Sequence, residues 1–245
     1  MIVDAHAHIG RVNDLKSEPE TLIAEMKKSG VTKAVISPMG KDIIFDNAKA
    51  NSKIAEIVKR FPRKFVGFAV ANPWLGSKSV LELERAISKL GLRGLILHPE
   101  LQGFQADDEI VDPVVEKAQR LQIPIYIPVG TPTCSTPHQL DLLAKRHPKA
   151  ILIMGHMGYP DLAPYVLPVA LKNSNIMLET SRVPELGLIE DAVRRLGAER
   201  VIFGSDYPYS RYELEVETVR LLNISSADRE MILGKSLLAL LGKGR

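Results

Sequence analysis

The sequence predicts a (β/α)8 TIM barrel with an extra C-terminal helix, formed by a single domain over residues 1–245. Eight short apolar runs alternate with longer amphipathic segments, and a chain of 245 residues has the length of one such barrel. The main alternative is an open doubly wound α/β sheet, but no glycine-rich phosphate loop follows the first apolar run. No proline- or glycine-rich linker divides the chain, which is why we expect one domain.

The eight apolar runs are typical of buried parallel strands, because they are short, rich in Val, Ile and Leu, and end in polar or turn residues. The first run is "MIVDAHAHI" and the last is "RVIFGSD". In chain order, the expected strands cover residues 1–9, 33–38, 64–73, 93–99, 123–130, 150–156, 175–181 and 200–206.

The segments between these strands carry helix-start signals, in which a side chain that accepts a hydrogen bond precedes the first helical turn. Residues 160–172 are less regular, because Pro164 and Pro168 shorten or bend any helix there. The last segment, from Ser225 to Leu241, predicts the extra helix, on the outside or the bottom of the barrel. The start signals are Ser17 with Glu20, Ser79 with Glu82, Asp112 before Pro113, and Thr136 before Pro137.

Charge and cysteine content argue against several classes of protein. The 32 basic and 29 acidic residues are scattered along the chain, so we expect no nucleic-acid partner. No apolar run approaches the roughly 18 residues that span a bilayer, and the N-terminal residues lack the apolar core of a signal peptide. The single cysteine, Cys134, allows no intramolecular disulfide. We therefore expect a soluble, cytoplasmic protein that binds a small molecule; its oligomeric state stays open, a homo-oligomer included.

Two histidines lie in the first expected strand, in "VDAHAHIG" at residues 3–10. Side chains of a strand alternate between its two faces, so His6 and His8 point the same way, with Cα atoms about 6.6 Å apart. Asp4 precedes them on the same alternation. Two imidazoles at this spacing can converge on one ion.

Three further polar residues lie at strand ends: His98 at the fourth, His156 at the sixth and Asp206 at the eighth. In this fold the C-terminal ends of the strands meet at one face. We therefore expect these residues beside the histidine pair, where their nitrogen and carboxylate groups suit zinc or a similar divalent ion. Taken singly, His98 also suits a loop hydrogen bond and Asp206 also suits a helix cap.

The motifs "VDAHAHIG", "RGLILHPELQGF", "IMGHMG" and "IFGSDYPY" resemble the amidohydrolase superfamily. In detail they are similar to its branch related to aminocarboxymuconate-semialdehyde decarboxylase, and the similarity spans the whole chain. The resemblance implies a metal-bearing barrel that acts on small organic molecules, with His6 and His8 as metal ligands. It further implies that Asp206 is a ligand or proton acceptor, and that His156 binds metal or activates water.

The chain departs from the family pattern at two positions. Pro128 in "IPIYIPVG" stands where the fifth strand of these proteins usually carries a metal-binding histidine, and Ile96 replaces a lysine of the fourth strand. A two-metal site bridged by a carboxylated lysine is therefore not expected. We expect a single ion, with zinc as the first choice, and either His98 or His156 as the source of the missing nitrogen.

The main functional interpretation is a metal-dependent hydrolase of an ester, lactone or amide. A divalent ion lowers the pKa of bound water toward neutrality, and Asp206 is the expected acceptor of the water proton. His156 is expected to polarise the substrate carbonyl or to stabilise the oxyanion that develops. Asp206 and His156 are therefore the expected catalytic residues.

Two alternatives stay open. In the first, a metal-dependent decarboxylase of an aromatic or unsaturated carboxylic acid uses the same residues, and Arg182, after the seventh strand, binds the substrate. Glu179 in that strand has the opposite charge and is a candidate partner for Arg182. In the second, the departure at Pro128 has left a metal-free barrel that binds or scaffolds another molecule.

Overall fold

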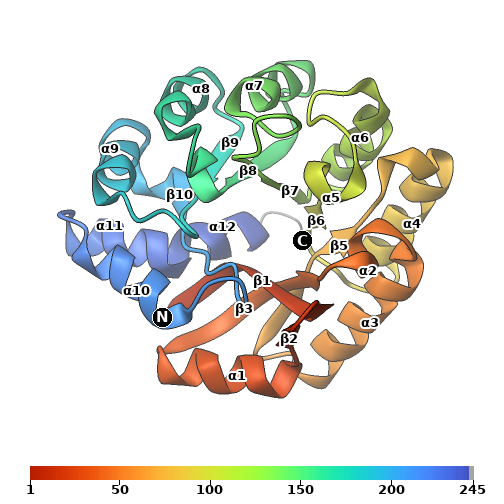
Figure 1. Ribbon diagram of the computed structural model, residues 1–245, viewed down its shortest axis with the longest axis horizontal. Coiled ribbons are helices and arrows are strands. Elements are labelled where there is room, and N and C mark those ends of the chain that lie inside the picture. The colour runs from red at the N-terminus through yellow and green to blue at the C-terminus, as the bar shows by residue number, and fades with distance from the viewer. Residues whose placement is uncertain (243–245) are drawn as a thin grey trace.

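The computed structural model describes residues 1–242, and its parallel strands form a ring enclosed by helices (Figure 1). A short strand, β2 (Leu15–Ser17), lies outside the ring and pairs antiparallel with the end of the first strand. The strands of the ring are β1 (Ile2–Val12), β3 (Val31–Pro38), β4 (Phe65–Gly67), β5 (Ala69–Val70), β6 (Leu95–Ile96), β7 (Pro124–Pro128), β8 (Ile151–Gly155), β9 (Ile176–Glu179) and β10 (Val201–Ile202).

Hydrogen bonds join the strands into a closed barrel. The two sheets have the orders β2-β1-β3-β4 and β10-β9-β8-β7-β6-β5. β4 and β5 are separated only by Phe68, whose N–H donates to the carbonyl oxygen of Ile36 in β3. At the other junction, the Ala5 N–H donates to the carbonyl oxygen of Phe203, which follows β10. The predicted α/β barrel is therefore confirmed.

Helices cover the outside of the barrel (Figure 1). Thr136 makes the expected capping box at the start of its helix. The helix caps predicted at Ser17 and Ser79 are wrong. Neither serine caps a helix, and both hydroxyl groups are buried without a hydrogen-bond partner. Asp112 is the first helical residue rather than a cap. The helices are α1 (Pro19–Lys28), α2 (Lys41–Ile44), α3 (Asn47–Arg60), α4 (Ser77–Ser88), α5 (Pro99–Gln102), α6 (Asp112–Arg120), α7 (Pro137–Arg146), α8 (Val166–Lys172), α9 (Leu186–Leu196), α10 (Tyr212–Leu221), α11 (Ser226–Glu230) and α12 (Ser236–Gly242).

A β-bulge in β1 decides where its polar side chains point. From Asp4 to Ala7, β1 advances three residues while the facing stretch of β3, from 34 to 36, advances two. An extra residue reverses the alternation of a strand, so Asp4 does not share the face of His6 and His8. The expected common alternation of the three residues is therefore wrong. Asp4 points toward α10 instead, where Tyr212 Oη donates to its carboxylate at 2.7 Å.

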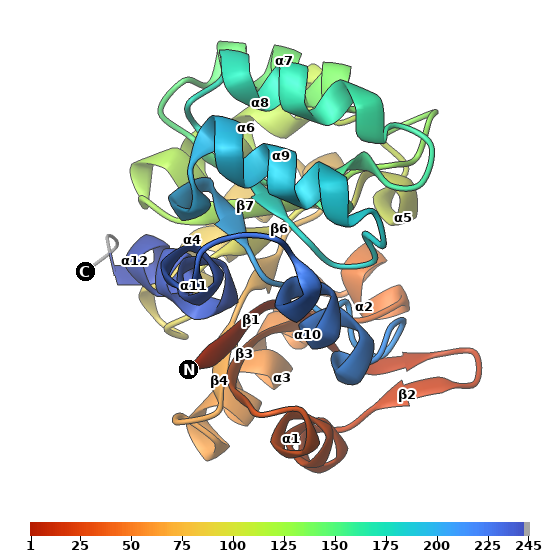
Figure 2. The ribbon, with the colours of Figure 1, turned by 90° about the vertical axis from the view of Figure 1, so that its left-hand side faces the viewer.

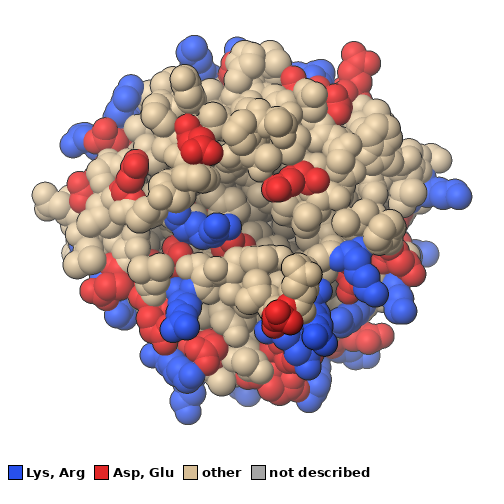
Figure 3. All heavy atoms as spheres, viewed as in Figure 1, with Lys and Arg blue, Asp and Glu red and all other residues tan. Residues whose placement is uncertain are grey.

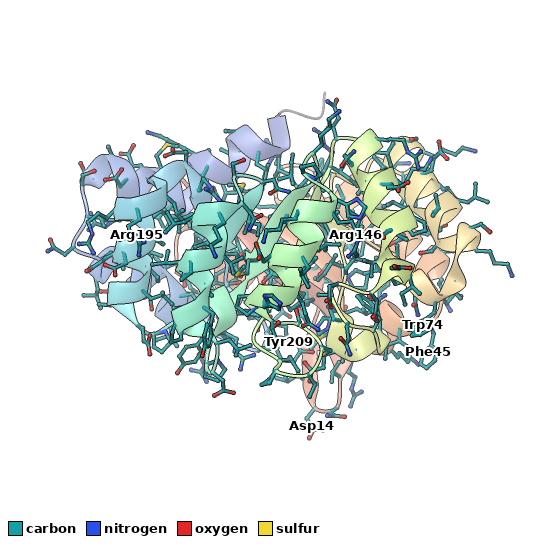
Figure 4. All side chains as sticks on the ribbon, turned by 90° about the horizontal axis from the view of Figure 1, so that it is seen from above. Asp14, Phe45, Trp74, Arg146, Arg195 and Tyr209 are labelled. Atoms are coloured by element: carbon teal, nitrogen blue, oxygen red, sulfur yellow. The ribbon has the colours of Figure 1, made fainter. Side chains whose placement is uncertain are left out.

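Apolar side chains fill the N-terminal end of the barrel. The C-terminal segment packs there, and the Phe203 N–H donates to the carbonyl oxygen of Ile232. Of the two positions expected for the extra helical segment, the outside or the bottom, the structure has the bottom, and Figure 4 shows the segment on the side opposite Asp14 and Tyr209. The cluster includes Val3, Ile96, Tyr126 and Ile153 of the strands, Phe68 between β4 and β5, and Leu237 and Leu240 of α12.

The opposite end of the barrel carries the loops that follow the strands. Figure 2 shows α5 and the β1–β2 hairpin at this end, and both labelled termini at the other. Among residues 1–242, no helix is both long and apolar enough to cross a bilayer.

Candidate metal centre and active site

Three side-chain atoms meet at the C-terminal end of the barrel, one each from His6, His8 and Asp206. The Nε2 atoms of His6 and His8 are 3.2 Å apart, and each lies 3.3 Å from Asp206 Oδ1. All three side chains are buried. We refer to these three atoms as the ligand triangle; the first strand of the barrel and the segment that follows the last strand supply them together.

The ligand triangle fits the coordination of one divalent ion. Bonds from zinc to nitrogen or oxygen are about 2.0–2.2 Å long. Ligands at the corners of a tetrahedron with such bonds lie roughly 3.4 Å apart, close to the spacing within the triangle. Two imidazole nitrogens and one carboxylate oxygen form a donor set that several divalent ions accept.

Backbone groups around the ligand triangle orient two of its members. His8 Nδ1 lies 3.1 Å from the carbonyl oxygen of Pro38, so the ring proton is on Nδ1 and Nε2 has a free lone pair. The Asp206 N–H donates to the His6 carbonyl oxygen at 2.8 Å, with Asp206 at φ 53°. Because α10 begins after Arg211, the helix-cap interpretation of Asp206 is wrong.

Asp4 joins the first and last strands behind the ligand triangle. Its Oδ1 accepts from the backbone N–H groups of His6 and Ser205, both at 2.9 Å. Its Oδ2 accepts from Ser205 Oγ and Tyr212 Oη, both at 2.7 Å. Burial raises the pKa of Asp4 to about 6, although these hydrogen bonds lower it. Asp4 therefore positions the backbone of His6 and faces away from the cavity.

His156 lies beside the ligand triangle, at the end of β8. Ligand atoms of His156, His6 and Asp206 lie within 4.8 Å of one another. Ser181 Oγ donates to Glu179 Oε2 at 2.9 Å, so it accepts from His156 Nδ1, which is also 2.9 Å away. The ring proton is then on Nδ1, and His156 Nε2 has a free lone pair.

Glu179 has a buried carboxyl group that helps to position two histidines: His156 directly, and His6 through Tyr126. It accepts hydrogen bonds from Tyr126 Oη at 2.7 Å and from the His156 N–H at 3.2 Å. The Tyr126 ring in turn stacks on His6, with ring centroids 4.0 Å apart. Burial raises the pKa of Glu179 to about 8, while its hydrogen bonds lower it. The expected pairing of Glu179 with Arg182 is wrong, because Arg182 contacts Asp206 instead.

Burial and hydrogen bonds set the protonation states of His6 and Asp206. Burial and, to a smaller extent, the neighbouring His8 together lower the pKa of His6 to about 3. Burial also raises the pKa of Asp206, but hydrogen bonds with His6 and His8 hold this pKa well below its usual value. Neutral imidazoles and an ionised carboxylate are the forms that bind a cation.

The ligand triangle opens into a cavity of about 390 Å³. Its walls include His98, Pro128, Arg182 and Glu100. Figure 3 shows the hollow at the centre of this face, with a basic side chain on its rim. The cavity has the size of a site for a small organic molecule. His98 lines it too.

Arg182 carries a positive charge into this cavity. Its Nη1 lies 3.5 Å from Asp206 Oδ2, and its side chain is 56% exposed. Among the described residues that line the cavity, it is the one Lys or Arg. The backbone N–H of Arg182 donates to Glu215 Oε2 at 3.0 Å, with Arg182 at φ 61°. Glu215 therefore holds the loop that presents the guanidinium.

Glu215 is expected to make the stability of the fold depend on pH. Burial raises the pKa of Glu215 to about 7 from 4.5, so between these values the folded chain retains a proton that the unfolded chain has released. The free energy of unfolding should therefore fall, relative to that of Glu215→Gln, as the pH rises from 4.5 to 7. Urea unfolding across this range measures the difference.

Glu213→Gln, at an exposed position of the same helix, is the control for the Glu215 prediction. Its free energy of unfolding should have the same pH dependence as that of the wild type. Parallel pH profiles for Glu215→Gln and the wild type would contradict it.

Sequence reasoning missed several residues of the site. Tyr209 stands edge-on to His8, with ring centroids 5.7 Å apart, and its position three residues after Asp206 in the "IFGSDYPY" loop was an available signal. Tyr126 and Ser181 gave no such signal, because their roles depend on contacts with other strands.

Several named proteins are similar to this chain in sequence. The gamma-resorcylate decarboxylase of Polaromonas sp. is 25% identical over 75% of this chain and 72% of its own length. The 2-amino-3-carboxymuconate-6-semialdehyde decarboxylase of Dictyostelium discoideum is 24% identical over 92% and 77%. The L-fucono-1,5-lactonase of Burkholderia ambifaria is 27% identical over 79% and 70%.

Solved structures share the fold. The 5-carboxyvanillate decarboxylase of Sphingomonas paucimobilis superposes with a TM-score of 0.81, at 18% identity and over 98% of both chains. A dihydroxybenzoic acid decarboxylase from Polaromonas sp., solved with manganese and the inhibitor 2-nitroresorcinol, gives 0.78 at 20% identity, over 100% of this chain and 97% of that one. A family model described as amidohydrolase matches residues 3–242. Because this match spans nearly the whole chain, the protein belongs to the amidohydrolase family, as its strand-end motifs predict.

Proposed function

We propose that this amidohydrolase-superfamily enzyme is a metal-dependent decarboxylase of an aromatic or unsaturated carboxylic acid. The observation that carries the proposal is the Arg182 guanidinium, 3.5 Å from Asp206 Oδ2 on the wall of the cavity that contains the ligand triangle. A guanidinium at this place suits a substrate that bears a carboxylate. The relatives named as decarboxylases support the same assignment. The sequence alone placed hydrolysis first, and these observations reverse that order.

His6, His8 and Asp206 would hold the ion, with His156 Nε2 as a fourth ligand or a base. A divalent ion, when bound, supplies positive charge that attracts substrate oxygens and stabilises negative charge as it develops. Zinc remains the prediction from sequence, whereas a similar protein of known structure contains manganese. The donor set of the ligand triangle suits either ion.

Arg182 and Asp206 have the two remaining roles, substrate binding and proton transfer. Arg182 binds and orients the carboxylate that is lost. Asp206 Oδ2 lies outside the ligand triangle, so this ionised oxygen is placed to take a proton from solvent and pass it to the carbon bearing this carboxylate. When the new C–H bond has formed, the C–C bond breaks, its electron pair stays with the substrate, and carbon dioxide leaves. The one proton consumed comes from solvent, and Asp206 is left ionised, as in the resting site.

Hydrolysis of a lactone is the second candidate, because an L-fucono-1,5-lactonase is among the relatives. In that reaction Asp206 accepts a proton from water and His156 faces the substrate carbonyl. The oriented lone pairs of the ligand triangle favour either enzyme over a metal-free scaffold.

The test is an assay of purified, metal-loaded protein on two panels: aromatic and unsaturated carboxylic acids, and lactones and esters. Release of carbon dioxide from an acid supports the proposal, whereas acid production from the second panel alone contradicts it. Arg182→Met should raise KM for the accepted acid by about 10–100-fold, since it removes a charge-assisted hydrogen bond. Arg195→Met is the control, because Figure 4 shows Arg195 on an outer helix, and its kinetics should be unchanged.

A further inference from the structure

His98 is held rigidly at the mouth of the barrel, where the chain passes from β6 into α5. Its backbone N–H donates to Gln102 Oε1 at 2.9 Å, and the Gln102 N–H donates to the His98 carbonyl oxygen at 2.9 Å. The Gln102 side chain also donates to the carbonyl oxygen of Ala71 at 3.1 Å. These bonds determine the place of His98 on the cavity wall.

The contacts of the His98 ring determine where its proton lies. The Leu101 N–H donates to His98 Nδ1 at 3.3 Å, where the ring caps α5. A ring that accepts at Nδ1 is neutral and carries its single proton on Nε2. No hydrogen bond to Nε2 occurs within residues 1–242, although the ring lines the cavity. His98 thus offers a donor, whereas His8 and His156 offer lone pairs.

His98 and Arg182 lie on different sides of the cavity. β6 and β9 are separated by β7 and β8 in the sheet, which amounts to roughly 14 Å along the barrel wall. Both side chains line the same cavity of about 390 Å³. A substrate whose carboxylate lies at Arg182 therefore extends its other end toward His98.

Glu100 determines what kind of group suits this side. Its carboxylate lines the cavity two residues after His98, and Thr131 Oγ1 donates to it at 3.2 Å. A second carboxylate of the substrate would be repelled here, because like charges destabilise one another. A hydroxyl group avoids that repulsion and still accepts a hydrogen bond.

We propose that His98 is a specificity-determining residue whose Nε2–H donates to a hydroxyl oxygen of the substrate, at the end of the molecule remote from the carboxylate that Arg182 binds. The proposal rests on the proposed function, because it takes the carboxylate at Arg182 as given. It also excludes His98 as a metal ligand, since a protonated Nε2 has no lone pair to offer.

Equilibrium binding to the manganese-loaded protein tests this proposal without any turnover. The probes are benzoate, 3-hydroxybenzoate, 4-hydroxybenzoate and isophthalate, each titrated by calorimetry. The wild type should bind the better of the two hydroxy acids about tenfold more tightly than benzoate, and isophthalate more weakly than that hydroxy acid.

His98→Asn separates the donor from the helix cap. Asparagine is a favoured N-cap residue, so the variant keeps the cap of α5 but lacks a donor at the Nε2 position. It should bind benzoate and manganese as the wild type does, and should bind the hydroxy acid no more than about twofold more tightly than benzoate. His98→Ser should give the same affinities as His98→Asn, because serine is also a favoured helix cap. The control is His138→Asn, at an exposed position, which should leave every affinity unchanged.

Four results would overturn the inference. If the asparagine variant keeps the preference for the hydroxy acid, His98 does not donate a hydrogen bond to the hydroxyl group. The same conclusion follows if the wild type has no such preference. If the asparagine variant folds but loses manganese, His98 is a ligand. If the wild type binds neither benzoate nor a hydroxy acid, the carboxylate site and the proposed function fail, and the inference fails with them.

Discussion

A His6→Ala variant is expected to lose its divalent ion and, with it, its activity. The change removes one corner of the ligand triangle, and Pro128 leaves no ligand on the fifth barrel strand to replace it. Loss of a residue that merely orients a ligand costs about 10–100-fold in metal affinity, so loss of the ligand itself should cost at least about 1000-fold. Elemental analysis after dialysis, together with the rate of carbon dioxide release, measures both effects.

Asp206→Ala should reproduce the result of His6→Ala, because it removes a second corner of the ligand triangle. His138→Ala is the matched control, since His138 is exposed on α7, and it should keep the metal content of the wild type. If His6→Ala retained that content, the ligand triangle would not be the metal site. If the folded wild type took up neither zinc nor manganese, the barrel would be a binding or scaffold protein.

Gly204→Ala is expected to destabilise the fold severely. A Cβ atom at this position would overlap Glu179 Oε1 and lie 2.6 Å from its Cδ. Glu179 cannot move aside, because it is fully buried and accepts hydrogen bonds from the side chains of Tyr126 and Ser181. Overpacking of a core costs about 1–3 kcal/mol, and this site should lie at or above the upper end of that range. Urea unfolding of the variant measures the loss.

Two variants separate the clash at Gly204 from a general effect of alanine. Gly187→Ala in α9 meets nothing within 4 Å, so its free energy of unfolding should equal or slightly exceed that of the wild type. In a Glu179→Ala background the clash is absent, so adding Gly204→Ala should cost less than about 1 kcal/mol. Equal costs of Gly204→Ala in both backgrounds would show that contact with Glu179 is not the cause.

The N-terminal motif shows how far a local pattern leads. The spacing of His6 and His8 predicts that their rings share one face, and their Nε2 atoms are 3.2 Å apart. The same alternation places Asp4 with them, which is wrong because a bulge intervenes. A bulge depends on pairing with a neighbouring strand, so the periodicity of one strand does not reveal it.

The predicted helix starts also separate what the local sequence determines from what tertiary contacts decide. Thr136 caps its helix as expected, since cap and helix are adjacent in the chain. Ser17 and Ser79 have equally good local signals, yet both hydroxyls are buried without partners. The packing of their segments against the barrel decided where those helices begin, and tertiary contacts outweigh the roughly 1 kcal/mol of a cap.

The sequence by itself determined the barrel, the strand ends and the residue types of the site, because these follow from local period and composition. Only the tertiary structure decided which atoms face the cavity. The proton on His98 Nε2 depends on the cap of α5, and the free lone pair of His156 depends on Ser181 and Glu179 of another strand. Hydrogen-bond geometry sets the protonated nitrogen of a histidine, whether the partner is three residues away, as Leu101 is for His98, or follows another strand, as Ser181 does for His156. The sequence pattern does not encode that geometry.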